Sequence, residues 1–289
     1  NVLDGGDGND NLTARSLTGD QTLLGGSGHD NLNATGKNVV LKGEEGNDRL
    51  NANASLNIGG VHSTVQNGAA TLSGGSGDDN LYAQKYDNAK LFGGADDDRL
   101  RTEQVTHSKL FGDEGDDVIA VDGYMNRNWR WDSNLQKDIL SYYFEGWNSN
   151  ANASNSAHLE GGIGDDALGV SGKGLASLRG DGGNDYLMAR YGWNVDLDGG
   201  DGNDRIRSEY SQRSALSGGA GNDDLRVQLY QGTSDGSKKW SADLDGGDGD
   251  DTLTVTGSSY NQKGRTDITA KGGSGNDTIH ISDVDVGHP

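Results

Sequence analysis

The sequence contains no cysteine and a single proline, and only 31% of its 289 residues are hydrophobic. Without cysteine, neither disulfide bonds nor thiolate metal sites can stabilise the fold. No run of about 18 apolar residues occurs, so we expect no transmembrane helix. The 24 Lys and Arg are outnumbered by 45 Asp and Glu, and the resulting charge of -21 argues against nucleic acid as a partner, because phosphates are bound by basic side chains. Cations are the natural partners of such a chain.

Glycine is abundant, at 49 positions, and much of it lies in twelve copies of a motif G-G-x-G-x-D-x-U, where U is Leu or Ile. The first position is always glycine, at Gly5, Gly25, Gly43, Gly74, Gly93, Gly112, Gly161, Gly180, Gly199, Gly218, Gly246 and Gly272. The sixth is always aspartate, at Asp10, Asp30, Asp48, Asp79, Asp98, Asp117, Asp166, Asp185, Asp204, Asp223, Asp251 and Asp277. The fourth is glycine at Gly8, Gly28, Gly46, Gly77, Gly115, Gly164, Gly183, Gly202, Gly221, Gly249 and Gly275, and Asp96 replaces it once. The basic spacing of 19 residues, lengthened at four places, is typical of a solenoid.

Apolar residues alternate with polar ones on both sides of each motif. A leucine stands two places before the first glycine in eleven copies, and Leu or Ile follows two places after the aspartate in all twelve. Alternation with a period of two predicts short strands with one inward face. We therefore expect an all-β fold, a right-handed parallel β-roll or β-helix solenoid of about twelve coils that forms one unit over residues 1–289.

Stacked coils would place each invariant aspartate above the next, roughly 5 Å apart, where like charges repel. A divalent cation between successive turns reverses this repulsion. Ca²⁺ accepts six or more oxygen ligands, which aspartates and exposed backbone carbonyls can supply, whereas Mg²⁺ demands a stricter octahedron. Twelve turns leave eleven gaps, so the sequence predicts up to about eleven Ca²⁺ along one edge.

The motifs resemble the RTX, or hemolysin-type, calcium-binding repeat. That resemblance implies a parallel β-roll in which carbonyls at motif positions one and three of one turn, carbonyls at positions two and four of the next, and aspartates from both bind each Ca²⁺. Carried over, Gly5, Asp7 and Asp10 would face Gly26, Gly28 and Asp30. The commonest members carry their nonapeptides in tandem and bind calcium at both edges. Here each coil has one motif, so we expect calcium at a single edge.

The longest spacing, between the motifs at Gly112 and Gly161, holds an aromatic-rich insertion at residues 122–158. Its segment SNLQKDILSYYFEG has capping-box spacing, an apolar stripe and a terminal glycine, which predict a short helix. One interpretation is a helix that packs on the roll as a buttress. The other is that Trp129, Trp131 and Trp147 remain exposed and contact a glycan or a surface protein.

The sequence favours a calcium-folded structural or adhesive segment of a secreted bacterial surface protein. With a dissociation constant near 10⁻⁴ M and calcium near 1 mM, each site would stabilise the fold by about 1.4 kcal/mol, and eleven sites by about 15 kcal/mol. The chain should therefore fold outside the cell, and the RTX resemblance implies type I secretion from a Gram-negative bacterium. The chain begins within a repeat, so we expect it to be a piece of a longer protein.

Other functions stay open. The segment could be the secretion and folding module of a toxin or hydrolase. Parallel β-helices also host polysaccharide-active enzymes, and Asp122, Arg130, Asp132, Asp138 and Glu145 could supply catalytic groups, but no second motif supports them and we expect no enzyme. Ice binding is disfavoured because no threonine rank occurs at motif position three. The six histidines lack metal spacing, and open strand edges at the rod ends allow end-to-end self-association.

Overall fold

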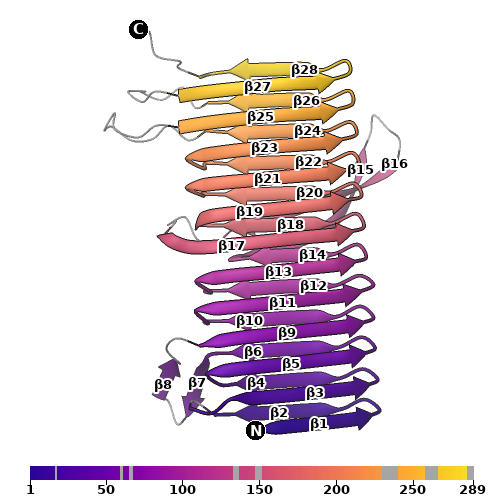
Figure 1. Cartoon of the computed structure of the whole chain (residues 1–289), viewed down its shortest axis with the longest axis vertical. Coiled ribbons are helices and arrows are strands. Elements are labelled where there is room, and N and C mark those ends of the chain that lie inside the picture. Colours follow the sequence, from indigo (N-terminus) through magenta and orange to yellow (C-terminus); the bar gives the residue numbers. More distant parts are fainter. Residues whose placement is uncertain are drawn as a thin grey trace.

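The computed structural model describes residues 1–16, 18–58, 61–64, 68–132, 137–146, 152–229, 240–257 and 266–284. These residues form an elongated stack in which the chain runs back and forth between two parallel sheets, with its ends at opposite ends of the column (Figure 1). Each sheet has twelve strands, and successive strands of one sheet come from successive coils. The predicted all-β class and parallel stacking are confirmed.

The first sheet consists of β1 (Val2–Asp7), β3 (Gln21–Ser27), β5 (Asn38–Glu45), β9 (Ala69–Ser76), β11 (Asn88–Ala95), β13 (His107–Glu114), β17 (Asn152–Ile163), β19 (Lys173–Gly182), β21 (Asn194–Asp201), β23 (Arg213–Ala220), β25 (Trp240–Asp248) and β27 (Thr266–Ser274). The second consists of β2 (Asn11–Arg15), β4 (Asn31–Thr35), β6 (Arg49–Asn53), β10 (Asn80–Gln84), β12 (Arg99–Glu103), β14 (Val118–Val121), β18 (Ala167–Ser171), β20 (Tyr186–Arg190), β22 (Arg205–Glu209), β24 (Asp224–Gln228), β26 (Thr252–Thr256) and β28 (Thr278–Ser282). In every coil the G-G-x-G-x-D-x-U motif turns the chain from the first sheet into the second, so all twelve motifs lie at one edge.

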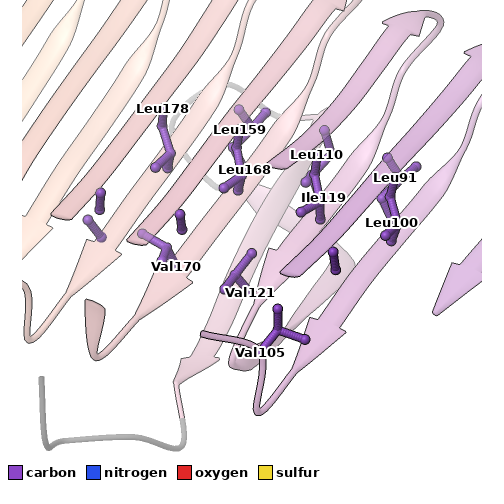
Figure 2. Close-up of a cluster of buried hydrophobic side chains, with 14 of the residues drawn as sticks. Leu91, Leu100, Val105, Leu110, Ile119, Val121, Leu159, Leu168, Val170 and Leu178 are labelled. Atoms are coloured by element: carbon purple, nitrogen blue, oxygen red, sulfur yellow. The ribbon is translucent and has the colours of Figure 1, made fainter. Parts of the chain in front are cut away.

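The core is a narrow double ladder of side chains between the two sheets. Leu91 pairs in register with Leu110 in the first sheet, and Leu100 with Ile119 in the second. All four are 0–1% exposed. Figure 2 shows these ladders continuing through the neighbouring coils. Because these ladder residues pair with their equivalents in the adjacent coils, the stability of the stack depends on the contacts between neighbouring coils.

Residues 137–146 correct the helix prediction. They form strand β16 (Lys137–Gly146), which pairs antiparallel with β15 (Gly123–Asp132), Trp129 lying opposite Leu140 and Trp131 opposite Asp138. The segment is rich in Ile, Tyr and Phe, whose branched and aromatic side chains favour strands, and β15 supplies a partner that the local pattern does not show. Residues 133–136 and Trp147 lie outside the described residues.

The hairpin β15–β16 packs against β18 and β20 on the outer face of the second sheet (Figure 1). There the outward-facing side chains Ala120, Ala167, Tyr186 and Met188 form a second apolar cluster and are at most 8% exposed. The backbone of the hairpin thus lies on the roll, while the side chains of Trp129 and Trp131, on which the glycan interpretation depends, lie outside the described residues. A smaller hairpin, β7 (Ser55–Ile58) and β8 (Val61–Thr64), extends another coil.

A buried ion pair lies where the large hairpin leaves the stack. Lys173 Nζ is 2.8 Å from Asp122 Oδ2, with side chains 1% and 9% exposed. Lys173 also donates to the Val105 carbonyl, and Asp122 Oδ1 accepts the Gln104 N–H. Asp122 was one of the carboxylates considered for catalysis, and here it is buried in an ion pair. Within the described residues no helix is long and apolar enough to cross a membrane.

Candidate metal centre

The motif turns have a backbone that explains where glycine is needed. Residues at motif positions two and four have positive φ in all twelve copies. Where glycine is replaced, Glu44, Asp96, Asp113 and Asp181 adopt φ of 83°, 78°, 81° and 72°. L residues occupy this left-handed region only with strain, and aspartate tolerates it better than most. The substitutions therefore strain single turns without changing their shape.

The first glycine is required for a different reason, because it lies beside two oxygen atoms. A Cβ atom on Gly199 would be 2.1 Å from Asp204 Oδ2 and 2.6 Å from the Gly218 carbonyl oxygen of the next coil. The equivalent pair of oxygens lies within 2.8 Å of such a Cβ at eleven first glycines, and at Gly272 only its own aspartate, Asp277, does so. At each of these eleven glycines a carboxylate oxygen and a carbonyl oxygen from the next coil thus face the same small space.

The invariant aspartates form a continuous column along this edge. The Oδ1 atom of each aspartate accepts the backbone N–H of the aspartate one coil earlier, as in Asp185 N–H to Asp204 Oδ1 at 2.7 Å. Eleven such bonds, of 2.7–3.1 Å, connect the twelve aspartates. The column from Asp30 to Asp251 is at most 3% exposed. Every coil is therefore fastened to the next through a buried carboxylate.

The second oxygen of these carboxylates has no hydrogen-bond donor. This holds for Oδ2 of Asp10, Asp30, Asp48, Asp79, Asp98, Asp117, Asp166, Asp185, Asp204, Asp223 and Asp251. A buried acceptor without a partner is destabilising by about 1–3 kcal/mol, and more when it is charged. Oxygen atoms that converge without a donor are the ligand set that Ca²⁺ prefers. The residues present therefore fit calcium, which when bound would supply the missing positive charge.

Burial alters the acidity of these carboxyl groups. Desolvation raises the pKa of Asp98 and of Asp166 from 3.8 to about 8, and that of Asp185 and of Asp204 to about 7. Neighbouring carboxylates raise these values further, and the backbone hydrogen bond to Oδ1 opposes the shift. The cation-free column thus resists ionisation, because each charge would be buried without compensation.

Side-chain clustering alone does not reveal these sites. Among the described residues, no three His, Cys, Asp or Glu side chains gather closely enough to hold a metal ion. Each coil supplies one buried carboxylate, and the remaining ligands must come from the backbone that the glycines expose. The structure places the predicted aspartates and first glycines together, while the fourth-position glycines shape the turn.

Motif position five carries a second column that the sequence analysis missed. In ten of the eleven successive pairs, its side chains accept the N–H of the fifth residue in the next coil, as in Asn203 N–H to Asn184 Oδ1 at 2.9 Å. His29 takes part through Nδ1, which accepts the Asn47 N–H at 2.8 Å. The sequence feature that could have revealed this column is the Asn or Asp that precedes the invariant aspartate in eleven of the twelve copies. This exposed column locks successive turns in register beside the buried one.

The fold and the edge formed by the motif turns define a parallel β-solenoid. Its coils are joined by buried carboxylates that lack a positively charged partner. A comparison with protein-family models matches the RTX calcium-binding nonapeptide repeat in four copies, at residues 1–16, 24–55, 66–85 and 269–280. The predicted resemblance to the RTX repeat is therefore confirmed at these four segments. Comparisons with curated proteins and with solved structures found no match.

We expect Gly199→Ala to disrupt one calcium site. The new methyl group would overlap Asp204 Oδ2 and the Gly218 carbonyl oxygen, so both must move. Overpacking of this kind destabilises by about 1–3 kcal/mol, and thermal melting in saturating calcium measures the loss. Gly182→Ala is the matched control, because its Cβ would meet only the Gly162 carbonyl oxygen, at 4.0 Å. Equal melting temperatures for the two variants would contradict the assignment.

Proposed function

We propose that this chain is a calcium-folded structural segment of a secreted bacterial surface protein, which stiffens on meeting extracellular calcium and extends or displays other domains. The observation that carries the proposal is the row of eleven buried carboxylate oxygens without a donor, one in each coil that has a successor. Calcium at these positions converts a destabilising column into the main contact between coils. RTX repeats are typical of secreted proteins of Gram-negative bacteria, which supports export as the route.

The shape of the molecule supports an extending or adhesive role. Its coils stack into one straight column whose two ends are far apart, with the hairpins β7–β8 and β15–β16 leaving from its sides (Figure 1). Of the residues considered for catalysis, Asp122 is held in an ion pair with Lys173, and the side chains of Arg130, Asp132, Asp138 and Glu145 lie outside the described residues. We propose that the stacked coils serve to display other domains and not to catalyse a reaction.

Asp204→Asn tests the proposal because its effect on the free energy of unfolding should have opposite signs with and without calcium. The variant keeps an oxygen that can accept the Asp185 N–H but removes the buried charge. In saturating calcium we expect lower stability, and native mass spectrometry should count about eleven ions in the wild type and at least one fewer in the variant. In EDTA with trimethylamine N-oxide, which strengthens burial, we expect the variant to be more stable than the wild type, by about 1–3 kcal/mol.

Asp196→Asn is the control, because Asp196 lies on the same coil in β21 but is exposed on the outer face. It should change neither the ion count nor the stability in either condition. A wild-type chain that binds only one or two calcium ions, or an Asp204→Asn variant that is destabilised equally with and without calcium, would show that the column is not the calcium site.

A further inference from the structure

The outer face of the second sheet carries a groove that the calcium sites do not explain. Strands β6, β10, β12 and β14 lie side by side in that order. Their register places outward-facing residues in two rows across the strands. The first row is Arg49, Asn80, Arg99 and Val118, and the second is Asn51, Tyr82, Arg101 and Ala120. Together with Leu50 and Leu100, these residues line a groove of about 420 Å³, a volume in the usual range of small-ligand sites.

The second row is held rigidly by a carboxylate. Glu103 Oε2 accepts the Tyr82 hydroxyl at 2.7 Å and lies 3.1 Å from Arg101 Nη2. The Arg101 guanidinium also lies 5.4 Å from the centre of the Tyr82 ring, a distance at which a cation and an aromatic face attract each other. Glu103 therefore neutralises Arg101 and fixes the floor of the groove before any ligand arrives.

The first row keeps its positive charge. Arg49 and Arg99 are exposed on either side of Asn80, about two strand spacings, or roughly 10 Å, apart. Among the described residues, no carboxylate is ion-paired with either guanidinium. Elsewhere on the same sheet, Arg190 pairs with Glu209 and Arg205 with Asp224. Two uncompensated guanidinium groups in a chain of charge -21 form a local binding surface for anions.

The ends of the groove differ in chemistry. At β14, Val118 and Ala120 give it an apolar end beside the hairpin β15–β16, which packs on the next strands. At β6, Asn51 and the amide of Asn80 offer donors and acceptors for hydroxyl groups. A ligand that matches this lining has carboxylates for the two arginines, hydroxyls for the asparagines and a C–H surface for the apolar end.

We propose that this groove binds a short carboxylate-bearing oligosaccharide, with Arg49 and Arg99 as its anion contacts. This goes beyond the proposed structural function, because it assigns a ligand to a face that calcium does not occupy. Sugar rings present the combination of charge, hydroxyls and apolar faces that the lining requires, and the groove is too small for a protein interface. Calcium is needed only to keep the strands folded and to offset the overall negative charge.

The test is calorimetric titration of the full chain in saturating calcium with a tetrasaccharide of galacturonic acid. We expect binding that weakens with added salt, and at least a tenfold loss of affinity for Arg49→Gln/Arg99→Gln. The control is Arg205→Gln/Arg226→Gln, which removes two arginines of the same sheet face outside the groove and should bind as the wild type does. Calcium bound by the sugar itself affects all three proteins equally, so the comparison between variants is unaffected.

Circular dichroism in calcium should show that both double variants fold, which separates loss of the ligand from loss of the coils. A neutral galactose tetrasaccharide should bind at least tenfold more weakly than the acidic one. The proposal is overturned by absence of binding to the wild type, by equal affinity for the neutral sugar, by tighter binding of hexaglutamate, or by unchanged affinity in Arg49→Gln/Arg99→Gln.

Discussion

Removal of calcium should unfold the whole chain cooperatively. Without a cation, eleven buried oxygens lack a partner, and at about 1–3 kcal/mol each their total of about 11–33 kcal/mol equals or exceeds the 5–15 kcal/mol that stabilises a typical domain. The hydrophobic ladders cannot offset this, because the core is one narrow double row and only 31% of residues are hydrophobic. With each site contributing about 1.4 kcal/mol at millimolar calcium, the balance reverses. Far-UV circular dichroism should show strands in 5 mM calcium and an unfolded chain in excess EDTA.

The transition should be steep in calcium concentration, because ions between adjacent coils stabilise both of them. Magnesium at the same concentration is the control for ionic strength, and it should restore little strand signal because its octahedron is stricter. Small-angle scattering should report a stiff rod with calcium and an expanded coil without it. A strand signal that persists unchanged in EDTA would show that the coils are held by something other than calcium.

Much of the fold could be predicted because the repeat makes local pattern and long-range contact coincide. Residues 19 positions apart, such as Leu91 and Leu110, become neighbours through the period itself, so finding the repeat also finds the pairing. The invariant aspartate and first glycine were identifiable for the same reason. Position five was missed because Asn and Asp are common in any turn, whereas their hydrogen bonds here run between coils.

Prediction failed where the repeat is interrupted. In residues 137–146, Ile139, Leu140 and Tyr143 fit a helical stripe as well as a strand, and the decision depended on pairing with residues 123–132. The groove between Arg49 and Arg99 was missed for the same reason. These two residues are 50 positions apart in the sequence, and only the register of three strands shows that they lie on the same face. Irregular features of a solenoid depend on such contacts between strands, and the local sequence pattern does not predict these contacts.

Acid should partly replace calcium in folding this chain. Desolvation raises the pKa of the column from 3.8 to about 6 for Asp48 and Asp223, to about 7 for Asp79 and Asp117, and to about 8 for Asp98 and Asp166. Because the pKa is higher in the folded state than in the unfolded state, this column favours folding most below about pH 4, where both states are protonated. That contribution is lost as the pH rises through about 6 to 8.

Calcium-free chain should therefore show strand signal near pH 4 and lose it progressively toward pH 8, the reverse of ordinary acid denaturation. Added calcium should change the signal little at pH 4 and greatly at pH 8, since only ionised carboxylates bind it. The sequence pI is about 4.4, so light scattering must accompany the titration to separate folded monomers from aggregates that also contain strands. A calcium-free signal that decreases from pH 8 to pH 4 would contradict the prediction, because protonation removes the charge whose burial opposes folding.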